Sequence, residues 1–98
     1  MNTNPIKSPD EIIADLGDRI KQRRLAGGLT QKTLADKAGV SRRALVQLEG
    51  GTGSTLQTLA RVLKAMDLDN NLSMLVPVPR VSPMSMLRDN RSRKRGVR

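Results

Sequence analysis

The 98-residue sequence predicts an all-α fold of four to five helices, followed by a basic C-terminal tail. Three observations lead to this prediction. Between residues 8 and 68 the apolar residues recur at spacings of three and four, which is the period of an amphipathic helix. Residues that commonly cap helices stand before these stretches, and glycines stand after the first three of them. No run of alternating polar and apolar residues, the pattern of a half-buried strand, occurs before residue 72.

The first helix is expected to begin after Ser8, where three signals agree. Ser8 can cap the helix, Pro9 suits its first position, and Glu11 completes a capping box. The helix is expected to end at Gly27-Gly28, because glycine adopts the left-handed conformation at little cost. Its predicted apolar stripe is Ile13, Leu16 and Ile20, with Ile12 and Leu25 beside it.

Two short helices follow, separated by a turn that begins with glycine. Thr30 is expected to cap a helix over residues 31–38, which Gly39 ends, and Ser41 to cap a helix that runs to Glu49. Val40 is expected to be a buried plug between the two helices. The residues expected to face inward are Leu34, Ala35, Ala38, Leu45 and Leu48.

A glycine-rich loop at residues 50–53 leads to the fourth helix, where Ser54 and Gln57 have the pattern of a second capping box. Its predicted apolar stripe is Leu56, Leu59, Ala60, Leu63 and Met66. The stretch 69–79 fits either a short fifth helix capped by Asp69 or Asn70, or an edge strand ended by its two prolines. We favour the helix, which would cover Leu72, Met74, Leu75 and Val76.

The charge is concentrated at the C-terminus. Of the formal net charge of +9, residues 1–79 carry +3, from eleven basic and eight acidic residues, and residues 80–98 carry +6, from seven basic residues and one acidic residue. A segment so rich in charge cannot bury apolar surface, so we expect it to be disordered when free. The expected organisation is a folded domain at 8–76 and a proline-containing linker with a basic tail at 77–98. Within the tail, Ser82-Pro83 is expected to start one helical turn through Leu87.

The composition excludes several classes of function. The chain has no Cys, His, Phe, Tyr or Trp, so it has no disulfide, no thiolate or imidazole metal ligand, and no aromatic platform for single-stranded nucleic acid. We expect no enzyme activity, no metal and no cofactor. A pI near 11.4 indicates a polyanionic partner, either nucleic acid or an anionic membrane. Membrane binding is disfavoured because no apolar anchor or signal segment accompanies the tail, and we expect a soluble cytoplasmic protein.

Residues 30–49 have the pattern of a helix-turn-helix unit. Gln31, Ala35 and Gly39 stand at i, i+4 and i+8. Two helices that cross at about 90–120° leave room only for a small residue where they touch, which Ala35 provides. The turn needs a residue that tolerates positive φ, which Gly39 provides. The residues that would fill the angle behind it are Val40, Leu45 and Leu48.

The stretch Leu29-Thr30-Gln31-Lys32-Thr33-Leu34-Ala35-Asp36-Lys37-Ala38-Gly39-Val40-Ser41 resembles the DNA-binding domain of phage-repressor-type (Cro/C1, or XRE) regulators. The resemblance covers about residues 12–68 and implies a lambda-repressor-like fold. Residues 54–68 and the opening Ser-Pro-x-x-Ile further resemble the HipB-like antitoxins. That resemblance implies a homodimer on operator DNA at the bacterial nucleoid, which represses its own operon and holds a HipA-like kinase toxin, single-chain or split. The alternatives are a stand-alone regulator without a toxin, and an antitoxin that neutralises its toxin mainly through its C-terminal segment.

The predicted DNA contacts surround the third helix, whose first turn enters a major groove first. Arginine can pair with O6 and N7 of guanine, glutamine with adenine, and alanine can approach a thymine methyl group. Backbone N–H groups at helix N-termini favour phosphate. The predicted contacts are Thr30, Gln31, Ser41, Arg42, Arg43, Ala44, Gln47, Thr52 and Ser54. The resemblance supports Gln31, Ser41, Arg42, Arg43 and Gln47 as first choices, and the alternatives are solvated charges for the arginines and simple helix caps for the serines.

Two further surfaces are predicted. The tail residues expected to contact phosphate or a partner protein are Arg88, Arg91, Arg93, Lys94, Arg95 and Arg98. An aliphatic core of about 70 residues is marginal, and dimerisation would bury more apolar area. The residues expected at the dimer interface are Met66, Leu68, Leu72, Leu75 and Val76. In HipB-like antitoxins a strand near the end of the domain helps to dimerise, and Pro77 and Pro79 depart from that pattern.

Overall fold

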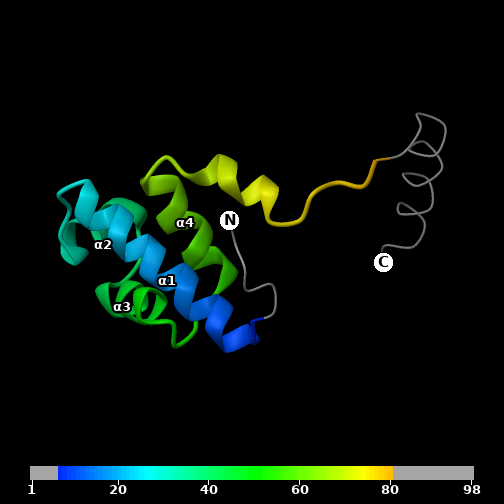
Figure 1. Ribbon diagram of the computed structural model, residues 1–98. Coiled ribbons are helices and arrows are strands. Elements are labelled where there is room, and N and C mark those ends of the chain that lie inside the picture. The colour runs from blue at the N-terminus through cyan, green and yellow to red at the C-terminus, as the bar shows by residue number, and fades with distance from the viewer. Residues whose placement is uncertain (1–6, 81–98) are drawn as a thin grey trace, which may run out of the picture.

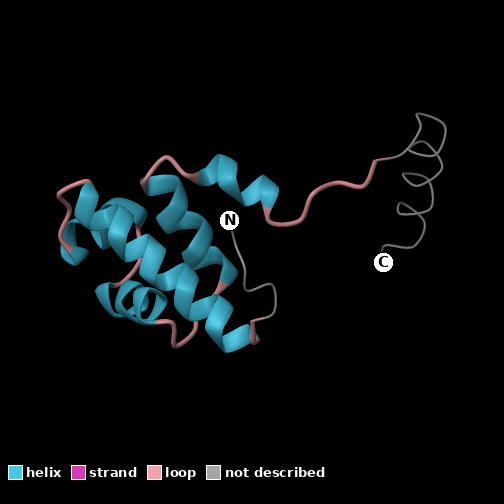
Figure 2. Ribbon diagram, in the orientation of Figure 1, coloured by secondary structure: helices cyan, strands magenta, loops and turns pink. Residues whose placement is uncertain are grey.

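The computed structural model describes residues 7–80, and this part of the chain is helical without a strand (Figures 1 and 2). The elements are α1 (Pro9–Ala26), α2 (Gln31–Ala38), α3 (Arg42–Gly50), α4 (Leu56–Ala65) and the 3₁₀ helix η1 (Asp69–Met74). The predicted all-α class is confirmed. The turn predicted at residues 82–87 lies outside the described residues.

The four α-helices surround one core. Helix α1 packs against α3, α2 packs against both α3 and α4, and η1 lies against α4. Helix α2 and helix α3 are joined by the short turn at Gly39, so the pair forms one side of the bundle (Figure 1).

The first three helices begin where predicted, and each start is capped by a side chain. Ser8 Oγ accepts the backbone N–H of Glu11 at 3.1 Å, and Glu11 Oε1 accepts the backbone N–H of Ser8 at 2.8 Å, which completes the capping box. The Ser8 backbone N–H, and after it the Ser8 side chain, stabilise the Glu11 carboxylate and so hold the pKa of Glu11 below its ordinary value. Thr30 and Ser41 cap α2 and α3 in the same manner.

The start of α4 differs from the prediction. The cap is Thr55, whose hydroxyl accepts the backbone N–H of Thr58 at 3.0 Å, whereas Ser54 Oγ donates to the Thr55 carbonyl. Both residues are good caps, and the loop, in which Gly53 has a φ of 125°, presents the second one. The predicted capping box is therefore wrong, because Gln57 lies at the second helical position instead of the third.

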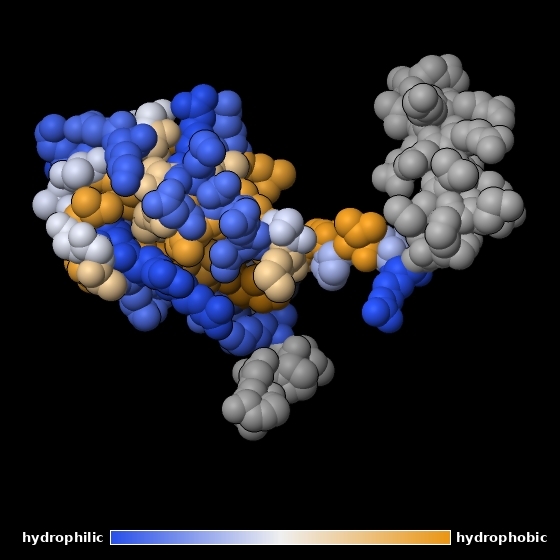
Figure 3. All heavy atoms as spheres, turned by 90° about the horizontal axis from the view of Figure 1, so that it is seen from above, coloured by the Kyte–Doolittle hydropathy of each residue, from blue (hydrophilic) through white to orange (hydrophobic). Residues whose placement is uncertain are grey.

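Residues 69–80 begin as a helix and end as an irregular arm. The prediction of a helix over a strand is confirmed, but the element is a short 3₁₀ helix without a side-chain cap, so the capping roles of Asp69 and Asn70 are wrong. Helix η1 ends at Met74, before Leu75 and Val76, because Pro77 disfavours a helical conformation of the residue before it. The following residues lead away from the helical body and carry exposed apolar side chains (Figures 1 and 3).

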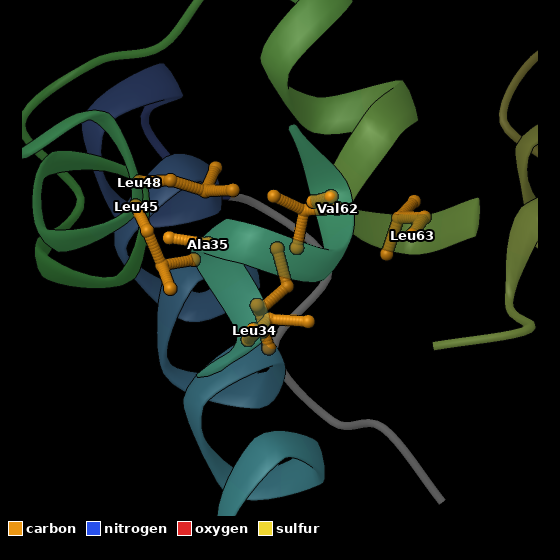
Figure 4. Close-up of a cluster of buried hydrophobic side chains, with 8 residues drawn as sticks. Leu34, Ala35, Leu45, Leu48, Val62 and Leu63 are labelled. Carbon is orange, nitrogen blue, oxygen red and sulfur yellow. The ribbon is translucent and has the colours of Figure 1, made fainter. Parts of the chain in front are cut away.

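The core contains aliphatic side chains from all four α-helices (Figure 4). Its buried members are Ile20, Leu34, Ala35, Ala38, Leu45, Leu48, Val62 and Leu63. Most were predicted to face inward, and Val40, Leu16, Leu59 and Met66 pack at its edge, half-buried. Val40 is thus less buried than the predicted plug.

Three predicted core positions are wrong. Ile13 is 42% exposed, because α1 is twice as long as α3 and its residue Gly17 already meets the C-terminal end of α3. Leu56 is 83% exposed, because the buried face of α4 passes through Val62 and Leu63 and the first turn of the helix extends past the core. Ala60 is exposed as well.

Candidate nucleic-acid interface

The turn between α2 and α3 is held from three directions. Gly39 has a φ of 72°, in the left-handed region that favours glycine. The backbone N–H of Val40 donates to the Ala35 carbonyl at 3.0 Å, and Arg61 Nη1, from α4, donates to the Gly39 carbonyl at 3.2 Å. Ala35 is buried where the two helices meet. These contacts fix the angle at which α3 leaves the body.

The first turn of α3 presents two exposed arginines. Ser41 caps this turn by accepting the N–H of Ala44 at 3.0 Å, and Arg42 and Arg43 follow it at the surface. Neither arginine forms a salt bridge within residues 7–80. Gln47 lies four residues after Arg43, so both side chains project from one face of the helix, while Arg42 is turned from Arg43 by about 100°.

A shallow depression with a polar lining adjoins this face of α3. Its volume is about 300 Å³. The lining residues are Ala44, Gln47, Thr52, Gly53, Ser54, Thr55 and Thr58. The structure thus brings together four of the predicted contacts, from α3 and from the loop that follows it. Thr55 and Thr58 join them and were not predicted, because their place depends on how the loop folds back.

The loop itself is tied to α3. The backbone N–H of Thr52 donates to the Gln47 carbonyl at 3.1 Å, and the Thr52 hydroxyl donates to the same oxygen at 3.3 Å. Gly51, in the left-handed conformation, makes the turn that this bond closes. The hydroxyls of Thr52 and Ser54 are both exposed, so each can meet a further hydrogen-bonding partner.

A buried ion pair supports the other side of the unit. Arg24 Nε donates to Glu49 Oε2 at 2.7 Å and Arg24 Nη2 to Glu49 Oε1 at 3.0 Å. Arg24 Nη1 donates to the Leu29 carbonyl at 2.9 Å. Gln31 Nε2 donates to Glu49 Oε1 at 3.2 Å. Gln31, at the start of α2, is therefore held by the C-terminal turn of α3, and its orientation depends on a pair of charges that is itself shielded from water.

Sequence reasoning missed this ion pair, although two spacings carry a signal for it. Arg24 lies four residues after the buried Ile20, and Glu49 lies four residues after the buried Leu45. Each charge thus falls on the buried face of its helix, where an unpaired charge is too costly to persist. Two opposite charges in such positions predict a pair.

The remaining predicted residues fall into three groups. Thr30 is exposed and its hydroxyl accepts the N–H of Thr33 as a cap. Of the predicted dimer residues, Met66, Leu68 and Leu72 are half-buried against the protein's own core, and only Leu75 and Val76 are largely exposed. The predicted tail contacts, Arg88 to Arg98, lie outside the described residues. No helix within residues 7–80 is long and apolar enough to cross a membrane.

Two short helices at a fixed angle, with an exposed and basic first turn on the second helix, define a helix-turn-helix DNA-binding domain. A family model described as helix-turn-helix matches residues 20–69, which is about half of the chain. The protein belongs to this family, the helix-turn-helix domains of the Cro/C1 (XRE) type, and is a DNA-binding transcription regulator. No curated protein sequence matches the chain.

Proposed function

We propose that the protein is a dimeric repressor that binds double-stranded operator DNA by placing α3 in the major groove. The observation that carries this proposal is the shared face of Arg43 and Gln47, which is exposed, cationic and bordered by the polar depression. A major groove admits one α-helix, and the N-terminal residues of that helix reach the base edges first.

The base contacts follow from the chemistry of each side chain. Arg43 donates two hydrogen bonds to O6 and N7 of a guanine, and Gln47, one turn further on, pairs with N6 and N7 of an adenine. Arg42 points about 100° away from Arg43 and meets a neighbouring base or the backbone beside it. Ala44 is half-buried at the wall of the depression and is small enough to approach a thymine methyl group.

The phosphate contacts flank this face on both sides. Ser41 accepts the Ala44 N–H through its hydroxyl oxygen and keeps its own proton to donate to a phosphate. The hydroxyls of the exposed residues Thr30, Thr52 and Ser54 donate to Thr33 Oγ1, the Gln47 carbonyl and the Thr55 carbonyl, and each would turn its proton from that acceptor to a phosphate. At the starts of α2 and α3, backbone N–H groups also favour an anion. The side-chain amide of Gln31 has two N–H donors, of which one bonds to Glu49 and the other is left for a phosphate. These contacts orient the domain on the duplex without reading sequence.

Methylation interference tests the groove assignment. Duplexes selected by the protein from a random pool are methylated at guanine N7, in the major groove, and adenine N3, in the minor groove. We expect interference at guanine N7, and the loss of one such position in the variant Arg43→Ala. Interference confined to adenine N3 would overturn the proposal.

We further propose that the protein is an antitoxin that represses its own operon and binds a HipA-like kinase, as its resemblance to HipB-like antitoxins implies. The test is co-expression with the product of the adjoining reading frame. Formation of a stable complex that relieves growth arrest supports the antitoxin role. If the protein does not bind that product and growth remains arrested, the antitoxin role is wrong and the protein is a stand-alone regulator.

The charge of the C-terminal segment favours a separate role for residues 80–98, in binding either phosphate or the toxin. Truncation after Pro79 separates the two. If the tail binds the DNA backbone, truncation lowers the slope of log affinity against log salt by about 0.9 for each phosphate that the tail neutralises, with base preference unchanged. If the tail binds the toxin, DNA affinity and slope persist in the truncated chain while toxin binding disappears.

A further inference from the structure

An apolar groove lies on the side of the domain away from α3. It has a volume of about 360 Å³ and runs between α1, α4 and η1, with no lining residue from α2 or α3. Its only polar lining residues are Arg19, Arg23 and Asn71. The apolar lining residues are Leu16, Ile20, Leu59, Leu63, Leu68, Leu72, Met74 and Leu75. An apolar segment that docks in this groove removes aliphatic surface from water, which is favourable.

An apolar arm, residues 75–79, begins at the rim of this groove and leads away from it. Leu75 is 61% exposed, Val76 81% and Val78 80%. Figure 3 shows hydrophobic side chains along the arm where it leaves the body. Pro77 and Pro79 fix their own φ near −65° and push the residues before them toward extended conformations, so the arm loses little entropy when it docks. Large exposed aliphatic residues next to one another mark an interaction surface.

The groove and the arm meet at Leu75, so a recess and a projection adjoin one another and can be complementary between two copies. A two-fold interface uses the same patch on both copies, so a projection on each copy must meet a recess on the other. We propose that two copies of this chain dimerise by reciprocal exchange, each placing its arm in the apolar groove of its partner. This inference rests on the proposed dimeric repressor and assigns its interface to the groove and Val78, beyond the residues predicted from sequence.

Charge decides against the basic tail as the occupant. The chain carries no charged residue from Asn70 to Pro79, so the arm enters the groove beside Arg19 and Arg23 without repulsion. The segment 80–98, with a net charge of +6, would bring like charges to the same two arginines.

Conformation decides against the chain's own arm as the occupant. To reach the groove of its own domain, the arm would have to reverse direction at Leu75 and Val76, directly at the rim that Leu75 lines. The chain bends at Leu75 and Val76 and then leads away from the body (Figure 1). Pro77 disfavours the helical conformation of Val76 that a further turn back toward the groove would need. The groove of a second copy needs no such reversal.

Sedimentation of the full chain over a dilution series, from high to sub-micromolar concentration, tests the exchange. We expect a dimer that dissociates on dilution, and a rise of at least about tenfold in its dissociation constant for Val78→Asp, because the new carboxylate would be buried against aliphatic side chains. The matched control is Leu25→Asp, which changes an exposed leucine outside the groove. A monomer at every concentration, or equal dissociation constants for the two variants, would overturn the inference.

Crosslinking identifies the partner of the arm. The chain has no cysteine, so each substitution introduces a single thiol. One preparation carries Val78→Cys, and a second preparation, with a tag that changes its size, carries Arg23→Cys. Oxidation of the mixture is expected to give a mixed disulfide, and Val78→Cys mixed with Lys32→Cys, on α2, is the control. A mixed disulfide no more abundant than in that control, or a monomeric internal disulfide in the double variant Arg23→Cys/Val78→Cys, would contradict the exchange.

The proposed dimer interface and the proposed DNA contacts can be tested independently. The variant Arg43→Ala is expected to sediment as the wild type does while its operator affinity falls. Val78→Asp is expected to retain binding to a half-site while it loses the concentration dependence of binding to the full site. If Val78→Asp remains a dimer and Arg43→Ala still loses DNA affinity, the interface assignment is wrong and the proposed DNA-binding function stands.

Discussion

The guanidinium of Arg24 and the carboxylate of Glu49 form a two-point ion pair in the interior, with N–O distances of 2.7 and 3.0 Å and side chains only 7% and 3% exposed. The pair joins α1 to the end of α3 across 25 positions of sequence. The Glu49 carboxylate also accepts a hydrogen bond from the side-chain amide N–H of Gln31, on α2. One carboxylate therefore ties together the two helices of the helix-turn-helix unit and the helix that supports them.

The substitution Glu49→Gln tests the contribution of this pair. It keeps the shape of the side chain and leaves the Arg24 guanidinium buried without a counter-charge, so we expect the free energy of unfolding to fall by about 3–5 kcal/mol. Urea denaturation followed by circular dichroism measures it. The matched control is Asp36→Asn, which breaks the exposed pair of Lys32 and Asp36 and is expected to cost less than about 1 kcal/mol. If the free energy of unfolding falls equally in Glu49→Gln and Asp36→Asn, burial does not increase the contribution of the Arg24–Glu49 pair to stability.

Gly17 sets the distance between α1 and α3. A Cβ at this position would overlap the Leu48 carbonyl oxygen and lie 2.8 Å from that of Glu49, and both are backbone atoms that cannot rotate away. We expect Gly17→Ala to lower the free energy of unfolding by about 1–3 kcal/mol, as overpacking does. Gly50→Ala is the control, since no atom lies within 4 Å of its Cβ and helical glycine is replaced by alanine at a gain of about 0.4–1 kcal/mol. If thermal unfolding gives Gly17→Ala and Gly50→Ala the same midpoint temperature as the wild type, the close packing of α1 on α3 at Gly17 is contradicted.

Two adjacent hydroxyls at the start of α4 give a direct comparison. Thr55 accepts the N–H of Thr58, whereas Ser54 only donates to a neighbouring carbonyl. We expect Thr55→Ala to cost about 1 kcal/mol of stability and Ser54→Ala much less. If urea denaturation ranks the two variants in the opposite order, Ser54 is the cap in solution and α4 begins one residue earlier.

The capping box of α1 gives a pH dependence with a defined sign. The pKa of Glu11 is lowered in the folded state, so its contribution to stability is complete above the ordinary glutamate pKa, about 4.3, and is lost as the pH falls through the lower folded value. The stability difference between the wild type and Glu11→Gln is therefore expected at neutral pH and should vanish in acid. Carboxyl NMR titration gives the pKa itself. Ser8→Ala keeps the backbone N–H that bonds to the Glu11 carboxylate and removes the hydroxyl, so it should return the pKa only part of the way toward the ordinary value. A Glu11 that titrates at the same pH in both proteins would exclude the Ser8 hydroxyl as a cause.

The parts of the fold that follow from the sequence are those decided locally. Ser8, Thr30 and Ser41 cap helices through bonds to residues three positions away, and Gly39 adopts the left-handed conformation that its place after α2 requires. The helix-turn-helix unit was predictable for this reason, because its caps, turn and small contact residue all lie within 20 residues.

The parts that could not be predicted depend on contacts between distant segments. Whether Leu56 is buried depends on where α4 begins to meet α2, and whether Ile13 is buried depends on where α3 ends beside α1. The polar depression needs the loop after α3 to return to Gln47, which a pattern of side chains does not specify. The groove beside η1 likewise exists only because a 3₁₀ helix, whose type the spacing did not indicate, forms one wall.

The most direct test of the central claim, that α3 reads DNA through its first turn, is the affinity of the full chain for a selected duplex, measured by fluorescence anisotropy. We predict that Arg42→Ala and Arg43→Ala each cost about 1–3 kcal/mol, and that the loss of an arginine that contacts a base relaxes the preference at that one base pair. Lys21→Ala, which removes an exposed cation from α1, should leave the affinity and the preference unchanged. Undiminished binding by the double variant Arg42→Ala/Arg43→Ala would contradict the claim.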